Sequence, residues 1–493
     1  MVMDTLIVRV RPGETRIARA DGDGRLKDFA VYREQGAGLV GDVFLGRVKK
    51  VIPAMEAAFV DIGADRDGFL ALPEARPQPH MGGEASRDRI SDYVHEGEAL
   101  SVQVLASSRD GKGAKLTRRV NVTGAFLVLT PNDPGIRLSK RIRDEAERSR
   151  LRTLLGGQLR DGEGCVVRSG AEGADQKTIQ GELDLLRTRW DEIKVHASHH
   201  TPPALISGDV PAPVQYLTEN GHAGIDKVIV DDGAVALRLE ADLETLGALP
   251  IGGVERHSGG GDVFEAAGVI DEAAGLMNAQ VRLPGGGSLI IEETAAVTTI
   301  DVNVGSAGDA QGAGKGGRAS DLALATNLAA MKEAARQMRL RNLAGLIVID
   351  ILTMSGKDGP GRVVTALKEA LAQDPTGPQV LGTTRGGLLE VTRPRRRPPL
   401  STQLLAPCPV CRMGRAEAPL SVGYRALDRV LTEVWAQPAL IPALRTQTSV
   451  VRALNKDGQA ALEEMEVKLG QPLELIADDA VAYGQFRVEP AER

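Results

Sequence analysis

The chain has few aromatic residues, few cysteines and no long apolar run. Phe, Trp and Tyr make up 3% of its 493 residues. Because aromatic side chains are this scarce, the cores must be packed with Leu, Val, Ile and Ala, and an aromatic side chain outside a core suggests a binding role. Three cysteines are too few for a disulfide framework in a chain of this length.

The N-terminus lacks the basic and apolar regions of a signal peptide. No apolar run approaches the roughly 20 residues needed to span a bilayer. We therefore expect a soluble, cytoplasmic protein without a membrane span. Its length predicts two to four domains.

The net charge of -6 would argue against a nucleic-acid partner if the charge were spread evenly. Basic residues are instead concentrated in runs at residues 140–143, 148–152 and 393–397. Such runs form either a local basic track for a nucleic acid, or solvated helix faces and a linker. The sequence alone leaves both interpretations open.

Short strands with turn residues between them follow residue 41 and predict a small barrel. They span residues 43–48, 57–62, 68–72 and 99–106. In the second of these, Ala58, Val60 and Ile62 face the core, which places Phe59 on the opposite face.

Phe69 faces outward from the next strand in the same way as Phe59. Two outward aromatic side chains on paired strands make a stacking platform for bases, and Lys112 and Lys115 are placed to follow the phosphates. The alternative is that another domain buries both rings.

Two aspartates lie on strands that a helix separates. Strand alternation at residues 297–304 places Thr299, Asp301 and Asn303 on one face. A helix over 320–340 leads to the apolar run 346–352, which is typical of a central buried strand and contains Asp350.

A strand-helix-strand crossover can make these two strands neighbours. A buried carboxylate such as that of Asp350 costs several kcal/mol unless something compensates it. Two carboxylates on adjacent strands suit Mg²⁺, which prefers oxygen ligands. The alternative is that one aspartate caps a turn and the other pairs with an arginine.

The sequence also contains a Cys-x-x-Cys pair, Cys408 and Cys411. A structural zinc site normally takes four protein ligands, and Cys165 is distant in sequence. Either two chains share one zinc ion, each contributing its pair, or the pair is a free dithiol.

Taken together, these segments resemble the ribonuclease E/G family. Residues 41–48 and 56–63 resemble its S1 domain. Four further segments resemble the family's catalytic domain, in the same order: residues 299–303, 326–330, 339–350 and 387–393. The resemblance covers essentially the whole chain and is strongest to members without a long disordered tail.

The resemblance implies an α/β and α+β multidomain fold in which an S1 (OB-fold) barrel is inserted in an RNase H-like domain. A 5′-sensor region, a DNase I-like catalytic domain, a zinc link and a small C-terminal oligomerisation domain complete it. The expected boundaries are 1–35 and 213–279 for the RNase H-like parts, 36–120 for S1, 121–212 for the sensor, 280–400 for the catalytic domain, 401–415 for the zinc link and 416–493 for the C-terminal domain.

The resemblance implies a magnesium-dependent endoribonuclease that cleaves single-stranded RNA, in maturation of ribosomal RNA or decay of messages. Products would carry 5′-phosphate and 3′-hydroxyl ends, and 5′-monophosphorylated substrates would be preferred. Asp301 and Asp350 would bind Mg²⁺, and Asn303 would help position the scissile phosphate.

Other implied roles lie outside the catalytic domain. Arg168 and Ser169 would sense the 5′-monophosphate, and the RNA channel would be lined by Phe59, Phe69 and Lys112. A zinc ion shared between two chains, held by Cys408 and Cys411 of each, would link a dimer, and the C-terminal domain would complete a tetramer.

The sequence departs from the family pattern at Thr353, where another acid is usual, and at Ser169, where threonine is usual. Residues 412–415 also lack the usual Gly-Thr-Gly ending after Cys411. The competing interpretation is a non-catalytic S1-type RNA-binding scaffold. A pure binder would have no need for a buried acid on a central strand.

Overall fold

The computed structural model describes residues 4–33, 40–64, 66–76, 88–106, 113–207, 211–220, 224–246, 253–305, 319–354, 358–395, 397–408, 415–437 and 439–491. The chain divides into two compact units. The first contains residues 36–228 and 232–256, and the second contains residues 2–35, 229–231 and 257–493. Among the described helices, none is both long and apolar enough to cross a membrane.

A closed β-barrel lies in the first unit, as the sequence predicts. Pairing between its first and last strands closes it. The strands, in spatial order, are β4 (Val43–Ile52), β5 (Ala57–Asp61), β6 (Gly68–Ala71), β8 (Lys115–Thr117) and β7 (Ala99–Ala106). A Cβ on Gly68 would come within 2.4 Å of the Leu116 side chain, so glycine allows β6 and β8 to approach this closely.

Beside the barrel, a second sheet of the first unit packs against two helices. Its order is β11 (Gly135–Leu138), β12 (Gly164–Val167), β10 (Leu127–Thr130) and β9 (Val122–Thr123). Helices α2 (Glu145–Gly156) and α3 (Gln176–His199) contribute Leu151, Leu155, Ile179 and Leu183 to its core. The remaining elements are α1 (Leu72–Ala75), β13 (Ala204–Leu205), α4 (Ala212–Asn220), α5 (Gly233–Leu246), β15 (Val254–Arg256) and the first residues of β14 (Ile225–Val230).

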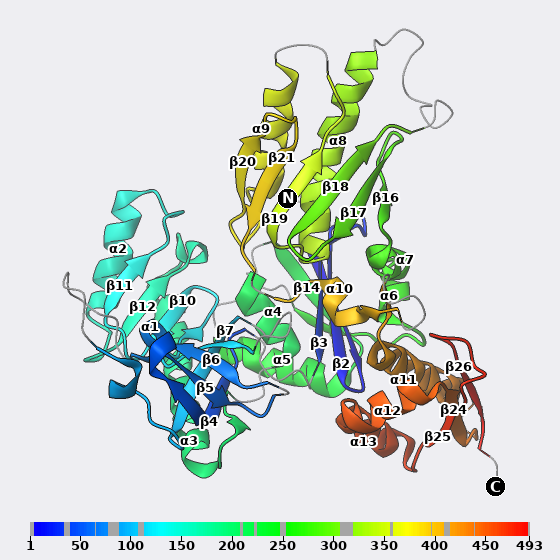
Figure 1. The fold of residues 1–493 in the computed structure, drawn as a ribbon, viewed down its shortest axis with the longest axis horizontal. Helices are drawn as coiled ribbons and strands as arrows, with labels where there is room; N and C mark the ends of the chain where they lie inside the picture. The colour runs from blue at the N-terminus through cyan, green and yellow to red at the C-terminus, as the bar shows by residue number, and fades with distance from the viewer. Residues whose placement is uncertain are drawn as a thin grey trace. The chain divides into compact units, whose positions relative to one another are not determined.

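The second unit contains a mixed sheet that α8 and α9 follow along one side (Figure 1). The strand order is β16 (Gln280–Arg282), β17 (Ser288–Glu293), β18 (Val297–Asn303), β19 (Gly345–Asp350), β21 (Leu389–Arg393) and β20 (Gln379–Thr383). The helices are α8 (Ala319–Leu340) and α9 (Gly359–Leu371). Helix α8 connects β18 to β19, which pair in parallel, so the expected strand-helix-strand crossover is confirmed.

One apolar stripe of α8 lies in the core of this sheet. Met331, Ala335 and Met338 are buried there, with Leu324 and Leu328 at its margin. They meet Ile300 and Ile349 from the sheet, together with apolar side chains of α9. One face of the sheet is therefore covered, and polar residues can occupy the other.

The N-terminal strands β1 (Asp4–Arg11), β2 (Glu14–Ala20) and β3 (Leu26–Arg33) form an antiparallel sheet in the second unit. Short helices α6 (Val263–Ala266) and α7 (Ile270–Ala274) share its core, in which Phe29 and Phe264 meet edge to face. Helix α10 (Leu400–Leu404) also contacts this core, before the hairpin of β22 (Leu405–Pro407) and β23 (Arg415–Glu417).

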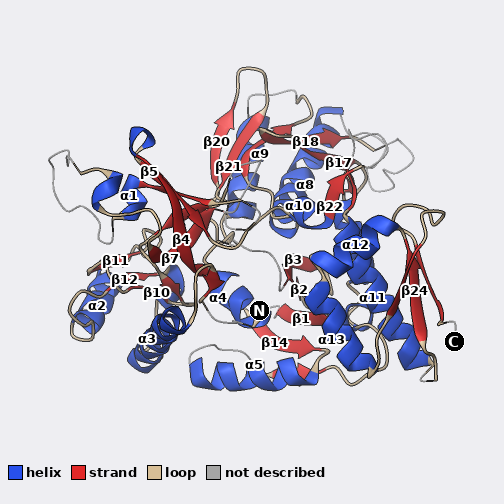
Figure 2. Cartoon of the chain, turned by 60° about the horizontal axis from the view of Figure 1, so that its bottom comes forward, coloured by secondary structure: helices blue, strands red, loops and turns tan. Residues whose placement is uncertain are grey.

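At the C-terminal end, three helices pack against one side of a small sheet, as Figure 2 shows. The sheet has the order β25 (Glu474–Ala477), β24 (Pro442–Thr446) and β26 (Phe486–Pro490). The helices are α11 (Pro419–Ala436), α12 (Thr448–Lys456) and α13 (Gln459–Leu469).

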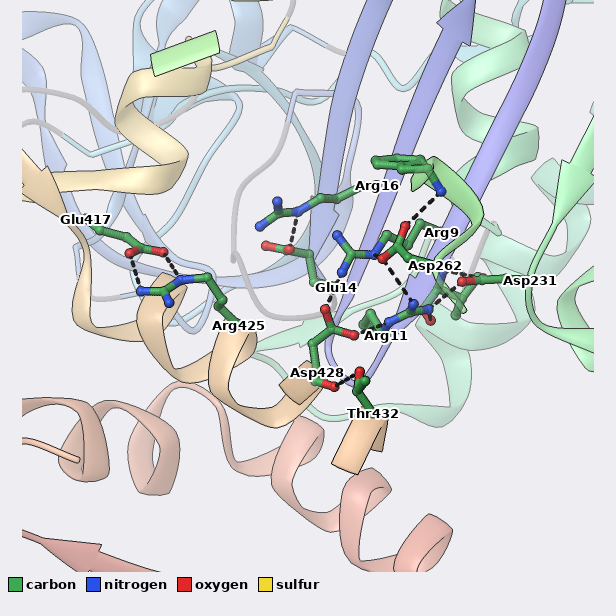
Figure 3. Close-up of polar contacts among 12 residues, drawn as sticks. Arg9, Arg11, Glu14, Arg16, Asp231, Asp262, Glu417, Arg425, Asp428 and Thr432 are labelled. Carbon is green, nitrogen blue, oxygen red and sulfur yellow. Dashed lines mark hydrogen bonds and ion pairs between the residues drawn. The ribbon is translucent and has the colours of Figure 1, made fainter. Parts of the chain in front are cut away.

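An ion-pair network joins this C-terminal part to β1 (Figure 3). Asp428 of α11 accepts hydrogen bonds from both Arg9 and Arg11. Arg9 also pairs with Asp262 at 2.9 Å, and Arg11 with Asp231. Because these charges are largely buried, each needs its partners, and the network fixes α11 on the N-terminal sheet.

Candidate active site

Asp301 and Asp350 stand opposite each other on neighbouring strands. In the parallel pairing of β18 with β19, Ile300 lies opposite Ile349 and Asp301 opposite Asp350. Neighbouring strands are about 4.8 Å apart, and residues in register point their side chains to the same face. The structure therefore brings these two carboxylates side by side.

The alternation predicted for β18 is confirmed. Thr298, Ile300 and Val302 are buried, whereas Asp301 is exposed and Asn303 is half-buried. The buried set faces α8, and the other set lies on the open face of the sheet. The sequence pattern alone was sufficient to find this face.

The expectation that Asp350 is buried was wrong. Ile347 and Ile349 are buried, but Leu346 and Val348 are only half-buried and Asp350 is exposed. The apolar run suggested burial on both faces, whereas the helices that the structure describes cover one face. Asp350 is the last residue of β19 and lies on the open face, where its charge remains solvated.

Asn303 lies next to the pair on the same strand. Its Nδ2 donates a hydrogen bond to Oδ2 of Asp301 at 2.8 Å. Within the described ranges, neither Asp301 nor Asp350 forms an ion pair with Lys, Arg or His. The described residues also hold no cluster of three or more His, Cys, Asp or Glu that could bind a metal ion, so a metal here would rest on two carboxylates, with water and substrate as its other ligands.

The outward aromatic pair of the barrel has the predicted arrangement. Phe59 of β5 lies opposite Phe69 of β6. Their ring centroids are 5.9 Å apart with an interplanar angle of 67°. Both rings are half-buried, whereas Ala58, Val60 and Leu70 are buried in the barrel. Lys112 lies outside the described residues.

Exposed lysines flank this aromatic pair on both sides. Lys115 of β8 is in register with Phe69, and Lys50 of β4 is in register with Phe59. The row Lys50, Phe59, Phe69 and Lys115 therefore crosses neighbouring strands of the barrel. Sequence reasoning missed Lys50, because a bulge between Val48 and Lys50 shifts the register.

Arg168 and Ser169 directly follow β12, and both are half-buried. The Arg168 guanidinium donates to backbone carbonyl oxygens of Gly124 at 2.5 Å, Glu219 at 3.2 Å and Thr218. Arg168 therefore ties the connection between β9 and β10 to the end of α4, and a phosphate would have to share this guanidinium.

The segment before β10 is also held by a buried carboxylate. Glu182 of α3 accepts backbone N–H groups from Ala125 at 2.5 Å and from Leu127 at 2.7 Å. Burial raises the pKa of Glu182, and these N–H donors only partly offset that effect. This carboxylate already occupies N–H groups that an anion could otherwise use.

Cys408 follows β22 directly, at the start of the connection between β22 and β23. Its predicted partner Cys411 lies outside the described residues. Cys165 is buried in β12, where burial raises the pKa of its thiol to about 11. Metals bind the thiolate form, which a raised thiol pKa disfavours. Cys165 therefore serves as a core residue and not as a metal ligand.

The basic runs are engaged within the fold. Arg150 binds Glu147 through two hydrogen bonds of 2.7 Å, which helps lower the pKa of Glu147 to about 2. Arg148 donates to the backbone oxygens of Ser139 and Ile142. Arg393 is buried in an ion pair. Arg148 and Arg150 lie on helix α2, as expected if these runs are helix faces, whereas Arg393 is buried in strand β21 and lies neither on a helix face nor in a linker.

The closed barrel and the helix-covered sheet with paired carboxylates define a multidomain α/β protein with an OB-like barrel. Residues 121–396 match the family model described as Ribonuclease E/G family. Ribonuclease G of Escherichia coli (strain K12) is 31% identical over 98% of this chain and 99% of its own length. The corresponding values for ribonuclease G of Haemophilus influenzae are 29%, 98% and 98%.

Ribonuclease E of Escherichia coli (strain K12) is 32% identical over 82% of this chain but only 38% of its own length. The chain belongs to the ribonuclease E/G family. The chain therefore matches the ribonuclease G relatives over nearly their full length.

Proposed function

We propose that the protein is a magnesium-dependent endoribonuclease that cleaves single-stranded RNA at the open face of the β18–β19 sheet. Membership of the ribonuclease E/G family supports the endoribonuclease activity. The observation that carries the site is the register of Asp301 with Asp350, with Asn303 bonded to Asp301.

The residues present suit Mg²⁺. Two adjacent carboxylates without a described cation partner supply hard oxygen ligands and leave positions for water and a phosphate. When bound, Mg²⁺ would stabilise the negative charge that develops on the scissile phosphate. One hydrogen of the Asn303 amide holds Asp301, and the second can donate to a phosphate oxygen. In-line attack by water would leave 5′-phosphate and 3′-hydroxyl ends.

The barrel would supply RNA affinity. Phe59 and Phe69 present rings for base stacking, and Lys50 and Lys115 lie where the backbone of a stacked strand would pass. Lys112 remains a predicted contact of the same surface. Stacking accepts every base, so this surface fits single-stranded RNA in general. We propose that the enzyme acts in maturation of ribosomal RNA or decay of messages. A cytoplasmic location is part of the same proposal.

Preference for a 5′-monophosphate would rest on Arg168 and Ser169. Wild type should cleave a 5′-monophosphorylated oligonucleotide faster than its 5′-hydroxyl counterpart. Ser169→Ala should reduce this ratio without changing the rate on the 5′-hydroxyl substrate. Ser169 is the residue to vary, because Arg168 also holds the backbone through its hydrogen bonds and its loss would disturb the fold. Equal cleavage rates of wild type on both substrates would contradict the proposed role of Arg168 and Ser169 in sensing the 5′-monophosphate.

A zinc ion shared through Cys408 and Cys411 would link two chains into a dimer, and the C-terminal domain would extend it to a tetramer. Metal analysis should find about half an equivalent of zinc per chain. Cys408→Ser should lose the zinc and lower the mass in solution. Absence of zinc from wild type would leave the pair as a free dithiol.

The catalytic assignment is tested with a 5′-monophosphorylated single-stranded oligonucleotide and Mg²⁺. Wild type should cleave it, whereas Asp301→Asn and Asp350→Asn should not. Glu292→Gln is the matched control, because Glu292 is exposed on the neighbouring strand β17 opposite Thr299, on the same face. It should keep wild-type activity. Cleavage by both aspartate variants at the wild-type rate would remove the site, and no cleavage by any protein would favour the RNA-binding scaffold.

A further inference from the structure

The chain leaves the sheet directly after Asp350, and a buried asparagine holds it there. Asn327 of α8 is 0% exposed. Its Oδ1 accepts the backbone N–H of Leu352 at 3.0 Å, and its Nδ2 donates to the backbone oxygen of Leu352 at 2.9 Å. Both polar atoms of the Asn327 side chain thus hydrogen-bond to the backbone of one residue, Leu352.

This clamp takes over where the strand ladders end. The pairing of β19 with β18 stops at Asp350, and its pairing with β21 stops at Ile349. Leu352 receives from Asn327 the donor and acceptor that a neighbouring strand would otherwise provide. A buried amide is stable only when its hydrogen bonds are made, so α8 and Leu352 are fixed to each other.

The two aspartates consequently depend on different supports. Asp301 lies within β18, which is paired with β17 on one side and β19 on the other. Asp350 is the last residue of β19: it is paired on one side only, with Asp301 of β18, and it stands two residues before the clamp at Leu352. Loss of the clamp would let the end of β19 fray and move Asp350, while Asp301 would stay in place.

We propose that Asn327 is a positioning residue for the metal site, which keeps the Asp350 carboxylate in register with Asp301. The inference rests on the proposed function, since it assigns Asn327 a part in binding the metal that these carboxylates would hold. It adds a residue from the covered side of the sheet to a site on the open side.

Asn342 provides a control from the connection between α8 and β19. It is also buried, and its Nδ2 donates to the backbone oxygens of Arg397 at 2.5 Å and Pro398 at 3.1 Å. It precedes β19, however, and so lies at the other end of the strand from Asp350. Asn342→Gly removes this amide and suits the positive φ of 51° at that position.

The test measures metal binding directly, by titrating Mn²⁺ into the full chain and recording the free ion by electron paramagnetic resonance. Asn327→Leu keeps the side-chain volume but makes no hydrogen bond. It should weaken Mn²⁺ binding by about 10- to 100-fold, the usual effect of losing a group that orients a metal ligand. It should also raise the Mg²⁺ concentration for half-maximal cleavage, with the KM for RNA unchanged. Asn342→Gly should bind Mn²⁺ as wild type does.

A second variant covers the case in which Asn327→Leu does not fold. Asn327→Ala removes both hydrogen bonds without adding volume or charge at this buried position, so it should weaken Mn²⁺ binding about as much as Asn327→Leu. Folded Asn327 variants with wild-type Mn²⁺ affinity would overturn the positioning role alone, provided that Asp301→Asn lowers that affinity. If Asp301→Asn also binds Mn²⁺ as wild type does, both the proposed metal site and this inference fail.

Discussion

The open face of the β18–β19 sheet and the outward face of the barrel differ in the charge that they present. The first carries Asp301 and Asp350, without a described cation paired to either. The second carries Phe59 and Phe69 between exposed lysines. RNA is a polyanion, so the carboxylate face repels it unless a cation intervenes, whereas the barrel face attracts it.

Under the proposed function, affinity and chemistry would be separated in this protein. The barrel face would bind RNA without a metal, and the carboxylate face would need a metal ion to accept a phosphate. A net charge of -6 is therefore compatible with an RNA substrate, because the positive charge is local. Variants on the two faces should change different measured quantities.

The largest effect should come from the carboxylates. Asp301→Asn should lower kcat by at least about 10³-fold, because loss of metal-based charge stabilisation costs several kcal/mol. Since both aspartates would hold one ion, Asp301→Asn with Asp350→Asn should be no worse than either alone. Single-turnover cleavage measures this. If the double variant instead lost kcat by the product of the two single losses, the two residues would act separately.

A third aspartate in the same unit shows what a paired carboxylate does instead. Asp374 is 0% exposed and its Oδ2 accepts from Nε of Arg393 at 2.9 Å. Burial acts to raise the pKa of Asp374, but Arg393 and hydrogen bonds from Thr376 outweigh it and lower the pKa. Such a group stabilises the fold above its unfolded pKa of about 3.9 and loses this contribution as pH falls through its folded pKa.

Asp374→Asn should therefore lower the free energy of unfolding by about 3–5 kcal/mol at pH 7, since it leaves the buried Arg393 without its oppositely charged partner. The difference from wild type should shrink as the pH is lowered below about 4. Urea unfolding at pH 7 and at pH 3.5 measures both values. A difference that does not change with pH would contradict the lowered pKa.

On the barrel face, Phe59→Ala should weaken binding of single-stranded RNA by about 1–3 kcal/mol, or roughly 5- to 150-fold in Kd. The cleavage rate at saturating RNA should stay near that of wild type. Leu205→Ala is the control, because Leu205 is exposed on β13, which pairs with β4. An equal loss of kcat in Phe59→Ala would mean that the ring also serves the chemical step.

The smallest effects should come from the lysines. Lys50→Gln and Lys115→Gln should each change Kd several-fold and reduce the slope of log K against log salt by about 0.7. Phe59→Ala should leave that slope unchanged. Lys194→Gln is the control, since Lys194 lies on α3 and pairs with Asp191 at 2.6 Å. Slopes identical to wild type in the lysine variants would exclude phosphate contacts at these positions.

Much of the site could be predicted from the sequence because it depends on strand alternation. A period of two places Asp301 and Asn303 on one face and Phe59 outside the barrel, whatever the rest of the fold does. The helix that follows β18 made a parallel crossover predictable, and hence the approach of Asp301 to Asp350.

Other features depend on contacts that no local pattern encodes. Asp350 is exposed because helices cover one face of the sheet, which an apolar run does not reveal. A bulge sets the register of Lys50 with Phe59. Arg393 looked like part of a basic track, but Asp374 neutralises it from 19 residues away in sequence. The clamp by Asn327 spans 25 residues: Asn327 lies in a segment that resembles the family, but no local pattern predicts its contact with Leu352.

The most direct test compares binding and cleavage of one 5′-monophosphorylated single-stranded RNA by wild type, Asp301→Asn and Phe59→Ala, with Mg²⁺ present. Asp301→Asn should bind this RNA with a Kd within about threefold of wild type and leave it uncut, because stacking on the barrel supplies affinity. Phe59→Ala should bind weakly yet cleave at the wild-type rate when saturated. Cleavage by Asp301→Asn at the wild-type rate would contradict the account.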